Sequence, residues 1–127
     1  MKALLVALAC LSICSDLAFG ADAPLPQFVG SYSGTFNPTR CKNGHDMNGG
    51  NFTLVVQATG EASGTLSNGL GSEPFAATCS KSGKVAGTYS ILGHNDKIRV
   101  KIDKSGLSLV GKATGAYCKY GIVAVKL

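Results

Sequence analysis

Hydrophobic and polar residues alternate along most of the chain with a period of two, which is the period of a half-buried β-strand. Phe52, Leu54 and Val56 fall on one face of such a strand, whereas Thr53 and Gln57 fall on the other. No segment carries a sustained apolar stripe at helical spacing. The pattern therefore predicts β-strands and almost no helix.

Clusters of Gly, Asn and Ser interrupt the alternation about every dozen residues. Short turns are expected at 59–60, 81–83, 93–96 and 104–106, whereas residues 37–50 form one long loop and residues 68–73 a shorter one. The eight predicted strands are Phe28–Phe36, Asn51–Ala58, Glu61–Ser67, Pro74–Ser80, Lys84–Ile91, Lys97–Asp103, Leu107–Thr114 and Ala116–Lys126.

Eight consecutive strands joined by short turns predict an antiparallel up-and-down meander, and closing this meander removes its two exposed edges. A small-Gly-small-large pattern recurs around Gly34, Gly64, Gly87 and Gly115. Glycine inside a strand permits the strong bending that a closed barrel requires. We therefore predict an all-β, single-domain barrel over residues 28–127, closed or nearly closed, with an extended lead-in at 21–27.

The succession of apolar, polar and glycine residues in 52–67 and 84–90 is similar to that of avidin-like and lipocalin-like barrels. This resemblance implies the same up-and-down architecture. The chain contains no Trp, the residue that lines the biotin pocket of avidins, so the resemblance implies no ligand and no site residues here.

The first 20 residues have the features of a signal peptide. A positive charge at Lys2 precedes an apolar run from Ala3 to Cys14, which is too short to span a bilayer as a helix. Small residues at Ala18 and Gly20 predict cleavage after Gly20. No later segment is long and apolar enough for a transmembrane helix, so we expect a secreted or periplasmic protein.

Three cysteines follow the predicted signal peptide, and an exported domain is expected to oxidise one pair of them. The strand order places Cys41, after the first strand, and Cys118, in the eighth, at the same end of adjacent strands. Cys79 falls at the opposite end, farther away than the roughly 7 Å between Cα atoms that a disulfide allows. This topology predicts a Cys41–Cys118 disulfide and a buried, free Cys79.

Charge is distributed unevenly along the chain. Residues 78–127 hold nine basic and two acidic side chains, whereas residues 21–77 hold two basic and four acidic ones. In the predicted strand 97–103, the basic residues alternate with isoleucine and valine and therefore share the outward face. Such a face suits a polyanion, although outward lysines also serve solvation and prevent edge pairing. The predicted basic face comprises Lys97, Arg99, Lys101, Lys104 and Lys112.

The long loop is a second candidate for recognition, because loops on a rigid scaffold commonly carry binding residues. Cysteine, histidine and aspartate there, together with His94 and Asp96 in a distant turn, are residue types that bind zinc. Their separation favours solvated loop side chains instead, so no metal is predicted. The loop candidates are Arg40, Lys42, His45 and Asp46.

Neither histidine of the chain, His45 or His94, has a recognisable nucleophile and orienting group, and no metalloprotease or phosphate-loop motif occurs. We therefore expect a binding protein without catalytic activity or cofactor, which recognises a protein or polyanionic partner through residues 37–50 and the basic face. Nucleic acid is not expected, because the basic strand carries no aromatic side chains for base stacking. The alternatives are a secreted or periplasmic inhibitor of a hydrolase and a carrier of a small ligand inside the barrel.

Overall fold

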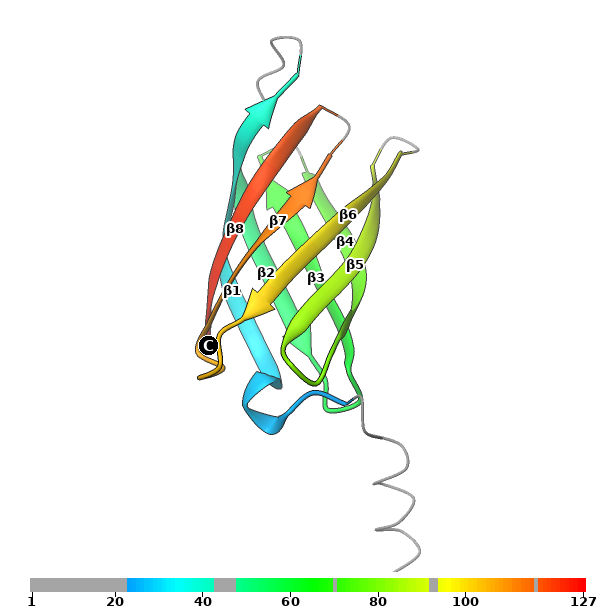
Figure 1. Ribbon diagram of the computed structural model, residues 1–127. Coiled ribbons are helices and arrows are strands. Elements are labelled where there is room, and N and C mark those ends of the chain that lie inside the picture. The colour runs from blue at the N-terminus through cyan, green and yellow to red at the C-terminus, as the bar shows by residue number, and fades with distance from the viewer. Residues whose placement is uncertain (1–22, 43–47, 70, 92–93, 116) are drawn as a thin grey trace, which may run out of the picture.

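The structure is a computed structural model that describes residues 23–42, 48–69, 71–91, 94–115 and 117–127. Eight antiparallel strands form a closed barrel in which each strand pairs with the next and β8 pairs with β1 (Figure 1). The predicted all-β barrel is therefore confirmed. A short 3-10 helix, η1 (Pro26–Phe28), precedes the strands β1 (Gly30–Cys41), β2 (Gly50–Val56), β3 (Glu61–Asn68), β4 (Gly71–Cys79), β5 (Lys84–Ile91), β6 (His94–Ile102), β7 (Ser108–Thr114) and β8 (Cys118–Lys126).

The strands extend into the segments that were expected to be loops. β1 continues to Cys41 because its pairing with β8 continues, with a register shift between Pro38 and Arg40. Proline has no N–H to donate, and the irregularity lets the ladder resume beyond it. The expected loop at 68–73 belongs largely to β3 and β4, and the expected turn at 93–96 is mostly the start of β6.

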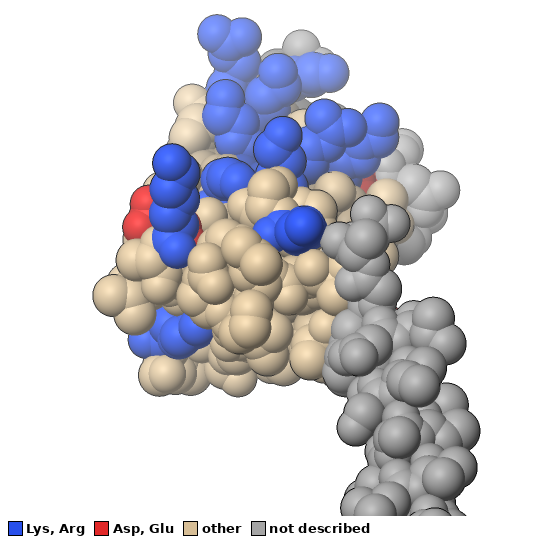
Figure 2. All heavy atoms as spheres, turned by 60° about the horizontal axis from the view of Figure 1, so that its bottom comes forward, with Lys and Arg blue, Asp and Glu red and all other residues tan. Residues whose placement is uncertain are grey.

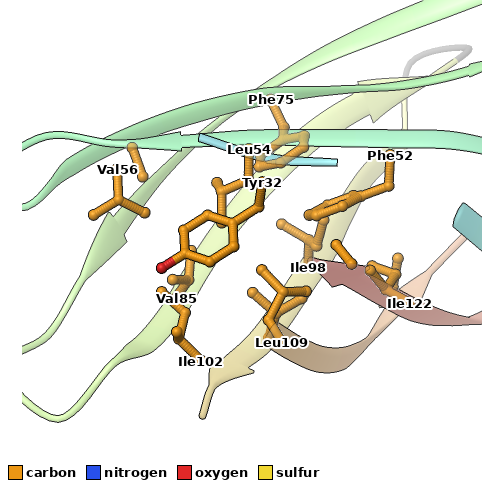
Figure 3. Close-up of a cluster of buried hydrophobic side chains, with 14 of the residues drawn as sticks. Tyr32, Phe52, Leu54, Val56, Phe75, Val85, Ile98, Ile102, Leu109 and Ile122 are labelled. Carbon is orange, nitrogen blue, oxygen red and sulfur yellow. The ribbon is translucent and has the colours of Figure 1, made fainter. Parts of the chain in front are cut away.

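The barrel interior is filled by inward side chains from many strands (Figure 3). Phe52 and Phe75 stack with their ring centroids 5.8 Å apart. Because burial alternates along each strand, the apolar residues that the sequence pattern placed on one face meet in a single core. The largest fully buried side chains are those of Tyr32, Phe52, Leu54, Val56, Ile98, Ile102, Leu109 and Ile122.

Inward glycines allow neighbouring strands to approach where the barrel bends. A Cβ added to Gly34 would lie 1.9 Å from the carbonyl oxygen of Val123, and one added to Gly64 would lie 1.9 Å from that of Thr53. No side chain fits at either position, in agreement with the role predicted for these two glycines. Gly115, which shares their sequence pattern, lies beyond the end of β7 instead.

The described part of the lead-in and the residues that join it to β1, 23–29, pack against the lower end of the barrel (Figure 1). Phe28 is buried, and its carbonyl oxygen accepts a hydrogen bond of 3.0 Å from the Tyr32 hydroxyl. The same hydroxyl lies 3.1 Å from the carbonyl oxygen of Gly106, in the turn between β6 and β7. The Lys126 ammonium donates to the Gln27 carbonyl oxygen at 2.5 Å. The lead-in is therefore part of the folded unit.

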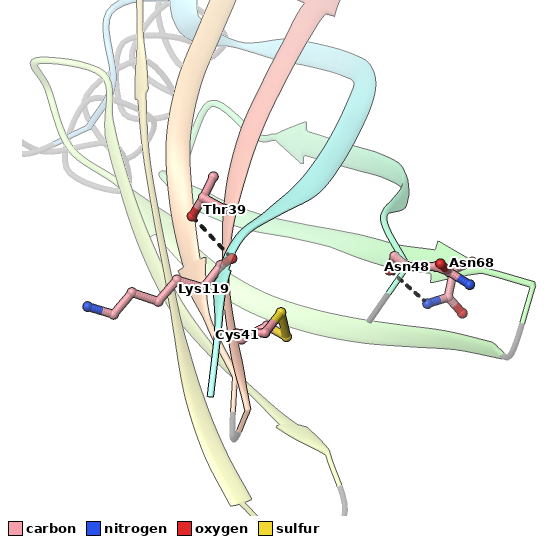
Figure 4. The surroundings of a disulfide bond; sticks show 6 residues. Thr39, Cys41, Asn48, Asn68 and Lys119 are labelled. Atoms are coloured by element: carbon pink, nitrogen blue, oxygen red, sulfur yellow. Dashed lines mark hydrogen bonds between the residues drawn. A yellow bond between two sulfur atoms is a disulfide. The ribbon is translucent and has the colours of Figure 1, made fainter. Parts of the chain in front are cut away.

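The disulfide joins Cys41 to Cys118 at the upper end of the barrel, across a Cα–Cα distance of 4.0 Å (Figure 4). Nearby, the Thr39 hydroxyl donates to the Lys119 carbonyl oxygen at 3.2 Å. Cys79, at the end of β4, is a buried free cysteine. Both parts of the cysteine prediction are confirmed.

Loss of the disulfide should destabilise the barrel substantially. The two cysteines are 77 residues apart, and closing a loop of that length stabilises a fold by about 4 kcal/mol in the chain-entropy description. We expect the free energy of unfolding of the Cys41→Ser/Cys118→Ser variant, measured by urea denaturation, to be lower than that of the wild-type protein by about this amount. Cys79→Ala is the control, because its stability should still fall when a reductant is added. An equal response of the double variant to reductant would contradict the assignment.

Stability should also depend on the ionisation of Tyr32. Burial, followed by the charge of Cys79, raises the pKa of Tyr32 to about 12 from its ordinary value of 10.0. The unfolded chain therefore loses this proton first, so the free energy of unfolding should fall as the pH rises from about 10 to about 12. Urea denaturation over this range should show a shallower decline for Tyr32→Phe. That variant should also lose about 1–2 kcal/mol at neutral pH, because the hydroxyl group no longer bonds to the carbonyl oxygens of Phe28 and Gly106.

Candidate functional site

The outward side of β6 is basic, as the sequence predicts. Lys97, Arg99 and Lys101 are exposed, whereas the alternate residues Ile98, Val100 and Ile102 are 1%, 5% and 1% exposed. Packing of these three apolar side chains in the core fixes the strand so that its cations point to solvent. The predicted register of this strand is therefore confirmed.

Strand pairing adds further cations on both sides of β6. Arg99 lies directly opposite Lys112 on β7, and Lys101 lies directly opposite Lys84 on β5. Lys84 is not among the predicted site residues, although it precedes the inward residue Val85 and pairing with the basic strand could have placed it. We call Lys84, Lys97, Arg99, Lys101 and Lys112 the cationic face.

The cationic face has no carboxylate to balance it on its own strands. Asp96 is the one acidic residue in β5, β6 and β7, and it points inward with 8% exposure. Two directly opposite pairs of like charges remain, Lys84–Lys101 and Arg99–Lys112. Like charges in this position destabilise a sheet, so the arrangement opposes folding slightly.

Figure 2 shows Lys and Arg side chains gathered over one side of the barrel, with few acidic side chains among them. A groove of about 960 Å³ runs between the cations, and Ala86, Val110 and Gly111 contribute to its lining. At its lower end, the Lys101 ammonium donates to the carbonyl oxygen of Ser82 in the turn between β4 and β5. The groove therefore combines several positive charges with a partly apolar lining.

The other predicted site residues that the structure describes do not line this groove. Lys104 is exposed in the turn after β6. Arg40 and Lys42 are exposed at the upper end, where they line a small pocket of about 200 Å³ with Lys119 beside the disulfide. Lys119 on β8 lies opposite Thr114 on β7, which lies opposite Lys97 on β6, so this cluster adjoins the upper end of the groove. The two remaining loop candidates, His45 and Asp46, lie outside the described residues.

Asp96 was expected to be a solvated turn residue, and this expectation is wrong. It lies on β6 opposite Tyr89, and the ladder between β5 and β6 turns it into the barrel. Burial, and then the negative charge of Asp96, raises the pKa of Tyr89, whose hydroxyl donates to the Thr114 carbonyl oxygen at 3.1 Å. The side chain of His94, the other turn residue considered for zinc, lies outside the described part of the chain.

The described part of the chain contains no cluster of metal-ligating side chains. No three His, Cys, Asp or Glu side chains there come close enough to hold a metal ion, and the Cys41 sulfur is bonded to that of Cys118. Within the same residues, no helix has the length and hydrophobicity needed to cross a membrane.

No protein-family model matches the chain, and no curated protein has a significantly similar sequence. A function must therefore be inferred from the chain's own residues.

Replacing one cation of a like-charged pair by a carboxylate should stabilise the fold. Lys112→Glu places an opposite charge across from Arg99, and we expect a gain of about 0.5–1 kcal/mol in the free energy of unfolding at low salt. High salt should reduce this gain by screening. Lys42→Glu is the control, because it changes net charge equally at an exposed position beyond the end of β1. Equal gains in both variants would show that net charge alone matters.

Proposed function

We propose that the protein is an exported, non-catalytic binding protein that holds a polyanionic partner on its cationic face. The observation that carries this proposal is the pair of opposed like charges, Lys84–Lys101 and Arg99–Lys112, on strands with no outward carboxylate. A bound anion would sit between these cations and turn an unfavourable contact into a favourable one.

The spacing of the cations favours a ligand with several negative groups. Alternate residues on a strand are about 6.6 Å apart, and opposite residues on neighbouring strands are separated by about 5 Å between Cβ atoms. Lys97, Arg99 and Lys101 therefore form a row, with one further cation beside it on each neighbouring strand. A chain or surface of phosphate or sulfate groups can contact several of these cations at once.

Export is supported by the signal-like sequence at residues 1–20 and by the Cys41–Cys118 disulfide, which persists in oxidising compartments. The packed side chains at mid-height in the barrel and the lead-in at its lower end favour the outer surface over the interior as the binding site.

Binding to sodium polyphosphate, measured by isothermal titration calorimetry over a series of salt concentrations, tests the proposal. The triple variant Lys97→Gln/Arg99→Gln/Lys112→Gln should bind at least about tenfold more weakly. Its dependence of log affinity on log salt should be shallower by about 0.7 for each lost contact.

The matched control is Arg40→Gln/Lys42→Gln/Lys81→Gln, which removes the same charge from exposed positions outside the cationic face. This control should keep most of the affinity of the wild-type protein. Equal losses in both variants, or no binding by the wild-type protein, would refute the proposal.

A further inference from the structure

The outward side of β7 and β8 carries exposed apolar side chains. Val110, Val123 and Val125 are 60%, 54% and 58% exposed, and Val110 lies directly opposite Val123. Leu107 and Leu127 continue this surface at the lower end, where the Leu107 carbonyl oxygen accepts a hydrogen bond from the backbone of Lys126. We call Leu107, Val110, Val123, Val125 and Leu127 the valine strip.

On β1 and at the start of β7, the residues beside the valine strip are small and uncharged. Ser33 and Thr35 on β1 lie opposite Val125 and Val123, and Ser108 on β7 also lies opposite Val125. Together they line a shallow groove of about 340 Å³. Single exposed apolar residues are ordinary, but a contiguous apolar patch marks a contact surface.

The valine strip directly adjoins the cationic face. Val110 pairs with Lys101 on one side and with Val123 on the other, and Lys112 follows two residues later on the same strand. β7 therefore belongs to both surfaces. Cations occupy β5 and β6, exposed valines occupy positions 123 and 125 of β8, and β7 carries one residue of each kind at its outward positions 110 and 112. At the upper end of β8, Lys119 is also exposed.

Charge decides which partner fits this combined surface. A second copy of the chain would bring a second net charge of +5 to a strip that already borders the cationic face. An anionic lipid bilayer instead offers phosphate groups beside an apolar layer, within about 5–10 Å of each other in depth. Long Lys and Arg side chains can reach past the curvature of the barrel to those phosphates while the valines lie against the membrane.

We infer that the valine strip and the cationic face together dock the protein on the surface of an anionic lipid bilayer. This inference rests on the proposed function, because the cations that hold a polyanion are those that meet the lipid phosphates. It adds the source of the anion and a role for apolar residues that a soluble polyanion would not contact.

Sedimentation with lipid vesicles distinguishes docking on an anionic bilayer from binding of a soluble polyanion. Vesicles of mixed phosphatidylglycerol and phosphatidylcholine should bind the protein, whereas pure phosphatidylcholine vesicles should not. The variant Val123→Thr/Val125→Thr, which leaves the groove residue Val110 in place, keeps β-branched side chains at exposed strand positions and should fold normally. Its partition into the anionic vesicles should fall about tenfold because less apolar surface is buried, while its affinity for polyphosphate stays unchanged.

A variant that is expected to bind vesicles more tightly tests whether misfolding causes the weaker binding. Ser33→Val/Thr35→Val widens the valine strip and should increase partition into anionic vesicles. Ser63→Val/Thr78→Val makes a comparable change on the outward side of β3 and β4, across the barrel from β7 and β8, and should have no effect.

Unchanged vesicle binding by the Val123→Thr/Val125→Thr variant would overturn the inference. So would a wild-type dimer, detected by sedimentation equilibrium, that this variant converts to a monomer, since the strip would then serve a second copy. Neither result contradicts the proposed binding of a polyanion on the cationic face, provided that the protein still binds polyphosphate. Failure to bind both polyphosphate and anionic vesicles would remove the proposed function as well.

Discussion

Pairing between the first and last strands is the contact on which the barrel depends, because it joins the two edges that a meander would otherwise expose. The ladder runs from Tyr32–Lys126 at the lower end to Cys41–Cys118 at the upper end. It joins segments that are distant in sequence, so its formation costs chain entropy. Each end of the ladder is fastened by further interactions. The upper pair is the disulfide itself, and both residues of the lower pair bind the lead-in, Tyr32 at the Phe28 carbonyl and Lys126 at the Gln27 carbonyl.

Closure also fixes which side chains face the solvent. A slip of one residue in β6 would turn Ile98 outward and bring Lys97 and Arg99 into the core, so burial of the core and display of the cations are one constraint. The repulsion between outward cations is weaker than the stabilisation from the buried core residues. A like-charged cross-strand pair costs up to about 1 kcal/mol, whereas burying an isoleucine side chain contributes about 1.5–3 kcal/mol. The core can therefore hold Arg99 opposite Lys112 despite their repulsion.

The number and order of the strands could be predicted from the sequence, whereas the exact ends of several strands could not. Alternation and turn residues were enough for the eight strands, and counting the hairpins then placed Cys41 beside Cys118. The continuation of β1 beyond Pro38 was missed, because only its pairing with β8 maintains it. Asp96 follows a turn-like His94-Asn95 sequence, yet its partner Tyr89 on β5 turns it inward. Lys84 was missed although the predicted meander placed its strand beside β6, because its alignment with Lys101 depends on the exact register of that hairpin.

The two sides of the barrel use their outward positions differently. On β2 and β3, Thr53 and Thr65 lie opposite each other, and their hydroxyl groups share a hydrogen bond of 2.8 Å, so these outward residues stabilise one another. On β5 to β8, two of the opposed outward pairs are cation with cation, Lys84–Lys101 and Arg99–Lys112, and one is a pair of exposed valines, Val110–Val123. These contacts gain little within the protein, since the charges repel and the valines remain exposed. Because internal stability does not account for these pairs, they are the residues on which the proposed binding of an anionic, partly apolar partner rests.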